Sequence, residues 1–285
     1  MVGLHVERAH VEEHEVLEDE SGEKPEDQVC PRMGDLEAIE HGGRSAAIVT
    51  WHATIRPVGV ASLGIRPTGE EDSQNGYYQT RFSYAPGRGG VWRVISRYLE
   101  RYLPPRAAIL DLGAGYCSFI NHVRAGEKHA LDVFPGFVDY AAADVRTYVS
   151  ACWNLSAFND GQLDIVFTSN VLEHLSRAEV LDTLHEVRRA LKPGGRLLII
   201  QPNFRYCARQ YFDDYTHQTV FSHVSLADLL ASVGFRVDVV IPRFLPLTLK
   251  SRLPQWPWAV ALYLRLPVRP MAKQMLLVAT RQGDK

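Results

Sequence analysis

The sequence lacks the features of a membrane protein and those of a disulfide or zinc scaffold. In its 285 residues, no uninterrupted apolar run approaches the roughly 20 residues that a membrane-spanning helix needs. The first twenty residues also lack the basic start and apolar core of a signal peptide. Its four cysteines are scattered, and no two of them form a Cys-x-x-Cys pair. These absences favour a cytoplasmic protein with reduced thiols.

Charge is distributed unevenly along the chain. Residues 1–40 carry a net charge of about −10, whereas no acidic residue occurs between Asp238 and Asp284. The acidic segment has too little apolar surface to offset the entropy of an ordered chain, so residues 1–42 are predicted to be a disordered tail. Residues 43–76 are predicted to be an extension without a firm assignment. The main domain then covers residues 77–285 and includes a basic, aromatic insertion at 242–270.

From residue 77 onward, short aliphatic and β-branched runs alternate with helical patterns. The seven runs that indicate strands are 107–111, 128–132, 145–150, 163–169, 195–202, 236–242 and 273–281. Apolar residues recur at helical spacing in 90–103, 177–195 and 225–235. Continuous apolar strands are typical of parallel sheets that are buried on both faces. The pattern predicts an α/β fold with a doubly wound, mostly parallel seven-stranded sheet.

The run "AAILDLGAGYCSF" at 107–119 joins a strand to a predicted helix through a glycine turn. Such turns bind many nucleotides, and Ser118 stands where a nicotinamide-binding turn has its third small residue. Asp111, however, would repel a pyrophosphate and suits a ligand with a positive group. Asp132 closes the next strand about 20 residues later, where a carboxylate can accept hydrogen bonds from ribose hydroxyls. An adenosine with a cationic amino-acid tail, S-adenosylmethionine, satisfies both acids.

Four motifs, "LDLGAGYCSF", "ALDVF", "LDIVFTSNVLEHL" and "LHEVRRALKPGGRLLIIQPN", occur in this order and at matching spacing. On these motifs the chain resembles the class I S-adenosylmethionine-dependent methyltransferases over roughly residues 77–281. It is similar to those of bacterial polysaccharide and natural-product sugar pathways. The resemblance implies a Rossmann-like methyltransferase fold whose last strand is antiparallel, and S-adenosylmethionine as the cofactor.

The resemblance also implies which residues hold the cofactor. The loop at 111–115 would bind the methionine part and Asp132 the ribose. The segment after the third strand would contact the adenine through Asn154, with Asp144 as a competing assignment. An aromatic or arginine side chain from the upstream "YYQTRFSY" would cover the cofactor carboxylate. The implied cofactor-binding residues are Tyr78, Arg81, Phe82, Asp111, Gly113, Ala114, Gly115, Asp132, Val133, Trp153, Asn154, Ser169 and Asn170.

The sequence after the fourth strand bears on the methyl acceptor. It has neither the Asn/Asp-Pro-Pro-Tyr of enzymes that methylate base or glutamine nitrogens nor a cysteine nucleophile for pyrimidine carbon. An oxygen acceptor is favoured, with carbon or an aliphatic amine as alternatives. The candidate catalytic residues are His174 and His217, the latter as a general base oriented by Asp213 or Asp214. No metal is predicted; a divalent metal held by Asp213, Asp214 and His217 is an alternative.

These patterns predict a soluble methyltransferase that uses S-adenosylmethionine to methylate a hydroxyl of a sugar or other small metabolite. Two alternatives are C-methylation of a quinone- or polyketide-like ring and a non-catalytic cofactor-binding module. A nicotinamide dehydrogenase is disfavoured by Asp111. The expected partner is a small-molecule or glycan acceptor, without nucleic acid. The insertion at 242–270 suggests a peripheral contact with a membrane or lipid-linked acceptor, or a homodimer contact.

Overall fold

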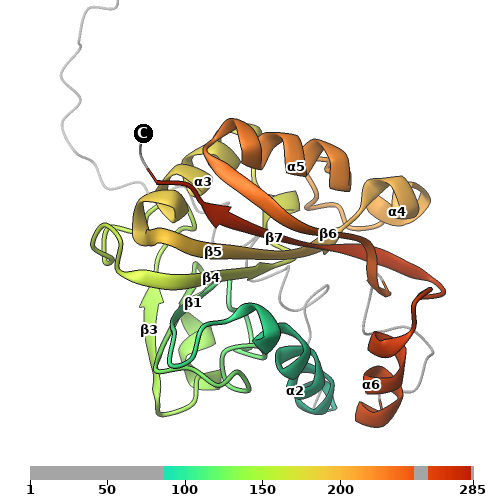
Figure 1. The fold of residues 1–285 in the computed structure, drawn as a ribbon, viewed down its shortest axis with the longest axis horizontal. Coiled ribbons are helices and arrows are strands. Elements are labelled where there is room, and N and C mark those ends of the chain that lie inside the picture. Colours follow the sequence, from blue (N-terminus) through green and yellow to red (C-terminus); the bar gives the residue numbers. More distant parts are fainter. Residues whose placement is uncertain (1–86, 247–255, 284–285) are drawn as a thin grey trace, which may run out of the picture. The chain divides into compact units, whose positions relative to one another are not determined.

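The computed structural model describes residues 87–246 and 256–283, which contain a seven-stranded sheet (Figure 1). The strands are β1 (Ala108–Leu112), β2 (Glu127–Asp132), β3 (Val145–Val149), β4 (Leu163–Ser169), β5 (Leu191–Pro202), β6 (Phe235–Pro246) and β7 (Ala272–Arg281). Their order in the sheet is β3-β2-β1-β4-β5-β7-β6. β7 runs antiparallel to both of its neighbours, and the other adjacent pairs are parallel. The predicted fold class is confirmed, including the antiparallel last strand.

Helices cover both faces of this sheet. The α-helices are α2 (Arg88–Leu99), α3 (Arg177–Ala190), α4 (Phe204–Tyr211), α5 (His223–Ser232) and α6 (Pro257–Arg265). Three short 3-10 helices are η1 (Glu100–Tyr102), η2 (Pro135–Tyr140) and η3 (Leu172–His174). Figure 1 shows α3, α4 and α5 on one face of the sheet and α2 and α6 on the other.

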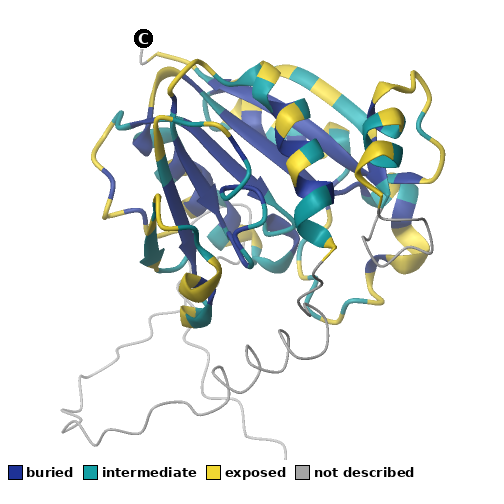
Figure 2. Cartoon of the chain, turned by 90° about the horizontal axis from the view of Figure 1, so that it is seen from below, coloured by how far each residue is buried: buried dark blue, intermediate teal, exposed yellow. Residues whose placement is uncertain are grey.

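Successive residues of each central strand enter different cores because side chains alternate across a strand. In β1, Ile109 packs into the core that α2 and α6 cover, whereas Leu110 packs into the core under α3 and α5. Leu198 and Leu197 of β5 divide between the two cores in the same way. Figure 2 shows these strands as the buried centre of the domain. Two-sided burial explains the continuous apolar runs of the sequence.

The helix that starts at Arg177 ends earlier than its apolar pattern suggests. Ser176 caps it: its hydroxyl accepts from the Glu179 amide at 3.3 Å, and the Glu179 carboxylate accepts from the Ser176 amide at 2.7 Å. The helix stops at Ala190, and Leu191 already begins β5. Pro193 explains the early stop, since a proline disfavours helical geometry in the residue before it.

One local prediction differs from the structure. The helix expected directly after the glycine turn is replaced by turns, because Cys117 adopts a left-handed backbone with φ of 52°. Only isolated helix-type bonds remain there, such as the Val123 amide on the Phe119 carbonyl at 3.1 Å. The segment after β5 contains α4, and the described part of the 242–270 insertion contains the end of β6 and α6.

Several predictions lie outside the described residues. These are the tail at 1–42, the extension at 43–76, residues 247–255 of the insertion, and Tyr78, Arg81 and Phe82. Among the helices that the structure describes, none combines the length and the apolar character that a membrane crossing requires.

Candidate functional site

The candidate site lies at the carboxyl edge of the sheet, where the strand order reverses. β1 is flanked by β2 on one side and β4 on the other. The chain runs outward from β1 through β2 to β3 and then returns to β4. Open α/β sheets bind ligands at such a switch point, beyond the carboxyl ends of the strands.

The glycine turn at the end of β1 has a backbone that favours glycine and no room for a side chain at Gly113. Gly113 has a φ of +74°, and a Cβ added to it would lie 2.3 Å from Cγ2 of Val171. The amides of Gly113 and Ala114 both donate to the carbonyl oxygen of Leu131, at 2.8 and 3.0 Å. The turn is therefore fixed to the end of β2 and packs against the residue that follows Asn170.

Asp132 anchors the same turn through its carboxylate. One oxygen accepts from the Gly115 amide at 2.8 Å, and the other accepts from the Phe134 amide at 2.9 Å. The residue is only 6% exposed. A carboxylate oxygen can accept more than one hydrogen bond, so these backbone partners leave capacity for ligand hydroxyls. Asp132 caps the strand end, and this position is compatible with the predicted ribose contact.

The side chain of Asp111 is buried. It is 3% exposed, and the Ile120 amide donates to one of its oxygens at 3.3 Å. Burial raises the pKa of this carboxyl to about 8, and the nearby charge of Asp132 adds to the shift. Asp111 therefore keeps its proton at neutral pH, and a cationic ligand group close by would favour its ionisation.

Two exposed apolar side chains follow the neighbouring strands at this edge. Val133 comes after β2 and is 47% exposed, and Trp153 comes after β3 and is 38% exposed. Next to Trp153, the exposed Asn154 accepts from the Ser156 amide through its side-chain oxygen at 3.3 Å. Asp144, the competing assignment, precedes β3 at the opposite edge and pairs with Lys128 at 2.9 Å. Its position removes it as an adenine contact.

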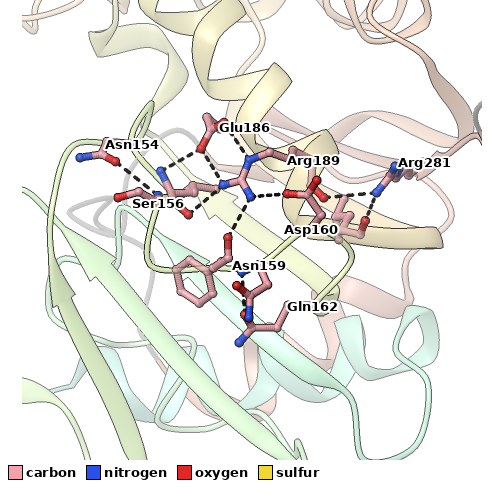
Figure 3. Close-up of polar contacts among 11 residues, drawn as sticks. Asn154, Ser156, Asn159, Asp160, Gln162, Glu186, Arg189 and Arg281 are labelled. Carbon is pink, nitrogen blue, oxygen red and sulfur yellow. Dashed lines mark hydrogen bonds and ion pairs between the residues drawn. The ribbon is translucent and has the colours of Figure 1, made fainter.

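A single arginine holds the loop that carries Trp153 and Asn154 (Figure 3). The Arg189 guanidinium donates to the carbonyl oxygens of Leu155 and Phe158, both at 2.9 Å. It also donates to Asp160 at 2.8 Å and to both carboxylate oxygens of Glu186, at 3.0 and 2.8 Å. A planar guanidinium can make this set of bonds at once, whereas a lysine ammonium cannot.

The end of β4 is held in a strained conformation. Asn170 has a left-handed backbone with φ of 55° although it is not glycine. Its amide donates to the Ile200 carbonyl at 2.8 Å, and its side-chain oxygen accepts from Gln274 at 2.8 Å. Its side-chain nitrogen lies 3.4 Å from the Ser169 hydroxyl. Ser169 and Asn170, which the resemblance implies as cofactor-binding residues, are thus held in place by β5 and β7.

The segment after α4 folds over η3, the short helix that follows Asn170. The Glu173 carbonyl oxygen accepts from the amides of Gln218 and Thr219, at 2.8 and 3.2 Å. The Gln218 side chain donates to the His174 carbonyl at 2.8 Å. These bonds bring the predicted catalytic residues His174 and His217 together from two distant parts of the sequence.

The two histidines lie edge to face, with ring centroids 4.8 Å apart. Nδ1 of His217 lies 2.6 Å from the Tyr211 carbonyl oxygen. Nδ1 of His174 lies 2.8 Å from the Thr216 hydroxyl, which itself donates to Asp214 at 2.6 Å. A carbonyl oxygen and a hydroxyl that has already donated its proton can only accept. Both Nδ1 atoms therefore carry the proton, and both Nε2 atoms carry the lone pair.

The described contacts give the two aspartates different surroundings. Asp213 is exposed and takes no part in the histidine network. The oxygen that orients His217 at Nδ1 belongs to Tyr211, and Asp214 acts on His174 through Thr216. The side chain of Asp213 is exposed because it lies at the turn that follows α4.

The sequence pattern does not single out Glu173, the third member of this cluster. It is 1% exposed, and neither of its carboxylate oxygens has a hydrogen-bond partner in another described residue. Burial raises its pKa to about 8, with a smaller contribution from Asp214. Burial and then the neighbouring His217 lower the pKa of His174 to about 4. The one feature of the sequence that could have indicated Glu173 as a site residue is that it directly precedes His174, a candidate catalytic residue.

Comparisons with known proteins agree with this geometry. Residues 110–199 match the methyltransferase domain family. The biotin biosynthesis bifunctional protein BioHC of Cellvibrio japonicus is 33% identical over 121 residues, which are 39% of this chain and 23% of that protein. The ribosomal protein L11 methyltransferase of Symbiobacterium thermophilum is 29% identical over 161 residues, 52% of this chain and 51% of that protein. The chain thus spans a quarter to a half of these curated relatives.

A solved structure shows the same fold. The 1,6-didemethyltoxoflavin-N1-methyltransferase of Burkholderia thailandensis, with bound 1,6-didemethyltoxoflavin and S-adenosylhomocysteine, superposes with a TM-score of 0.50 at 18% identity. The match covers 75% of this chain and 87% of that structure. Residues 110–199 thus match a methyltransferase domain, and the described residues share the fold of an S-adenosylmethionine-dependent methyltransferase structure. The predictions of a methyltransferase and of its cofactor are confirmed at this level.

Proposed function

We propose that the protein transfers a methyl group from S-adenosylmethionine to a hydroxyl oxygen of a sugar or another small hydroxylated metabolite. The observation that carries this proposal is the polar cluster of Glu173, His174 and His217 next to the glycine turn. Val171, the residue that packs on Gly113, lies two positions before Glu173. This closeness supports a role for the cluster on the acceptor side of the methyl donor.

The chain's own residues fit the proposed cofactor. The turn from Gly113 to Gly115 is held in place by the Leu131 carbonyl and the Asp132 carboxylate, which supports its role as the loop for the methionine part. Asp132 has acceptor capacity for ribose hydroxyls, and the exposed Val133 and Trp153 offer apolar surface for an adenine ring. Asn154 is exposed beside Trp153, where its amide can contact the ring edge.

When bound, S-adenosylmethionine supplies an activated methyl group on a sulfonium sulfur. The protein's main task is then to position the acceptor, since near-attack geometry alone can lower a barrier by up to about 7–11 kcal/mol. His217 adds a base: its Nδ1 proton is held by the Tyr211 carbonyl, so Nε2 is the atom that can take the hydroxyl proton. Such general-base assistance is worth roughly 10²–10⁴-fold in rate.

An acid, Asp214, is linked to the histidine pair through the Thr216 hydroxyl. Asp214 is ionised at neutral pH, because the two hydrogen bonds from Thr216 outweigh its burial and keep its pKa below the usual range. The Glu173 carboxyl, whose pKa burial raises to about 8, is a second acid, with an oxygen within 4.8 Å of a nitrogen of each ring. A short-lived imidazolium is stabilised by such neighbours.

The experiment that tests the proposal uses cofactor with a carbon-13 methyl group and a panel of hydroxylated sugars, quinone-like rings and aliphatic amines. We expect the label in an O-methyl group. His217→Gln should lose roughly 10²–10⁴-fold in turnover while His185→Gln, at an exposed histidine of α3, keeps the parent rate. A label on ring carbon would instead identify a C-methyltransferase. Cofactor binding without transfer to any acceptor would support a non-catalytic module.

A further inference from the structure

Three side chains of the acceptor cluster converge in a way that suits a metal ion. One ligand atom from each of Glu173, His174 and His217 lies within 4.8 Å of the other two. We propose that these three residues bind a divalent transition-metal cation of the zinc type. The metal's part in methyl transfer rests on the proposed function, whereas the binding itself does not.

The hydrogen-bonding groups of the cluster favour a cation. Nδ1 of His174 donates to Thr216 and Nδ1 of His217 donates to the Tyr211 carbonyl, so the lone pair of each neutral ring lies on Nε2. The Glu173 carboxylate is buried, and no other described residue donates to either of its oxygens. The buried Glu173 carboxyl, which has no hydrogen-bond partner of its own among the described residues, thus meets the ring nitrogens of two histidines. A cation satisfies all three at once.

Hydrogen bonds at Nδ1 hold both histidine rings in place. A histidine that binds a metal almost always donates its other ring N–H to a carbonyl, a carboxylate or a hydrogen-bonded group that fixes the ring. His217 donates to the Tyr211 carbonyl at 2.6 Å, and His174 donates to Thr216, which is held by Asp214. Both rings are therefore oriented before any ion binds.

Spacing and ligand type select the class of ion. Ligand atoms around a tetrahedral zinc ion stand about 3.3 Å apart, because the bonds are about 2.0–2.2 Å long. Closing a cluster of 4.8 Å to that spacing needs side-chain movements of about 1 Å or less. Two imidazoles and one carboxylate suit Zn²⁺, Co²⁺, Fe²⁺ or Mn²⁺, whereas Mg²⁺ prefers oxygen ligands alone.

The site also leaves room for an acceptor. Three protein ligands leave at least one coordination position open, which is the arrangement of catalytic rather than structural zinc sites. His174 and His217 are only partly buried, so the open side is reachable. A hydroxyl oxygen bound there would be placed and made more acidic by the ion, beside the turn that the cofactor would occupy.

Binding is tested by calorimetric titration of Zn²⁺ into the chelator-treated full-length protein, without cofactor or acceptor. We expect one equivalent to bind in the micromolar range or tighter and Mg²⁺ to give no comparable signal. Co²⁺ titration should produce the visible absorption of a nitrogen- and oxygen-ligated ion. Absence of Zn²⁺ binding by the folded parent protein would overturn the proposal.

Variants locate the ion. Glu173→Gln and His217→Asn should each weaken Zn²⁺ binding at least tenfold and change the Co²⁺ spectrum. The N-terminal segment carries His5, His10 and His14 among many carboxylates, so replacing these three by Asn together is the matched control and should leave affinity unchanged. Loss of binding in that control, with full affinity in both cluster variants, would refute the site.

The outcome separates this inference from the proposed methyl transfer. Chelation should abolish transfer to the acceptor and leave cofactor affinity within about twofold, and Zn²⁺ should restore transfer. Failure of methyl transfer in a protein that binds Zn²⁺ through Glu173 would count only against the proposed function. Full methyl transfer by a chelated protein that binds no metal would count only against the metal site.

Discussion

The close contact between the glycine turn and Val171 gives a prediction whose size can be worked out from the structure. In Gly113→Ala, the new Cβ would lie 2.3 Å from Cγ2 of Val171, against about 3.5–4.0 Å for a comfortable contact. The φ of +74° adds a left-handed backbone cost of roughly 1–2 kcal/mol, and overpacking adds roughly 1–3 kcal/mol. The free energy of unfolding should fall by about 2–5 kcal/mol, which lowers Tm by roughly 4–20 °C.

Gly194→Ala is the matched control for this substitution. Gly194 has a φ of +80°, and no atom of a described residue lies within 4 Å of its added Cβ. It should show the backbone cost alone, roughly 1–2 kcal/mol, with unchanged affinity for S-adenosylmethionine. Gly113→Ala should weaken that affinity at least tenfold, and adding Val171→Ala should recover part of the stability. Equal losses in Gly113→Ala and Gly194→Ala, by urea unfolding and calorimetry, would refute the packing argument.

Two further predictions concern Asp111 and Arg189. The folded state holds the Asp111 proton up to a pKa of about 8, far above the ordinary value of 3.8, so stability should fall as pH rises from about 4 to about 8. Urea titrations between pH 5 and 7.5 should show that Asp111→Asn removes a slope of up to about 1.4 kcal/mol per pH unit, and an unchanged slope would contradict the assignment. Arg189→Lys should free the loop of Trp153 and Asn154, since a lysine cannot make the five bonds of this arginine. Amide hydrogen exchange at residues 155–160 should become faster, and unchanged protection would show that the loop is held by other contacts.

The sheet could be predicted from the sequence because its strands are buried on both faces. Runs such as "LDIVFTS" have no competing helical period, and the strand at 163–169 occurs with the predicted bounds. The helix after the glycine turn could not be excluded in this way. Its absence depends on the left-handed conformation of Cys117, for which the sequence offers no glycine as a signal.

The cofactor part of the candidate site could be predicted from the sequence, whereas the acceptor cluster of Glu173, His174 and His217 could be predicted only in part. Asp111 and Asp132 lie in the last residues of β1 and β2, and Gly113 directly follows β1, so the fold itself determines their positions. The acceptor cluster depends on bonds between η3 and residues 211–219, which are about 40 positions apart. Those tertiary bonds bury Glu173 and replace Asp213 by the Tyr211 carbonyl beside His217, and no local pattern encodes them.

Calorimetric titration of S-adenosylmethionine into the full-length protein tests the central claim most directly. The account predicts a Kd in the micromolar range, about −8 kcal/mol. Asp132→Ala should lose roughly 1–3 kcal/mol, about 5–150-fold, with the folded state checked by circular dichroism. Asp144→Ala, at the opposite edge of the sheet, should bind like the parent. No binding to the parent, or equal affinity in the Asp132→Ala variant, would contradict the cofactor site described above.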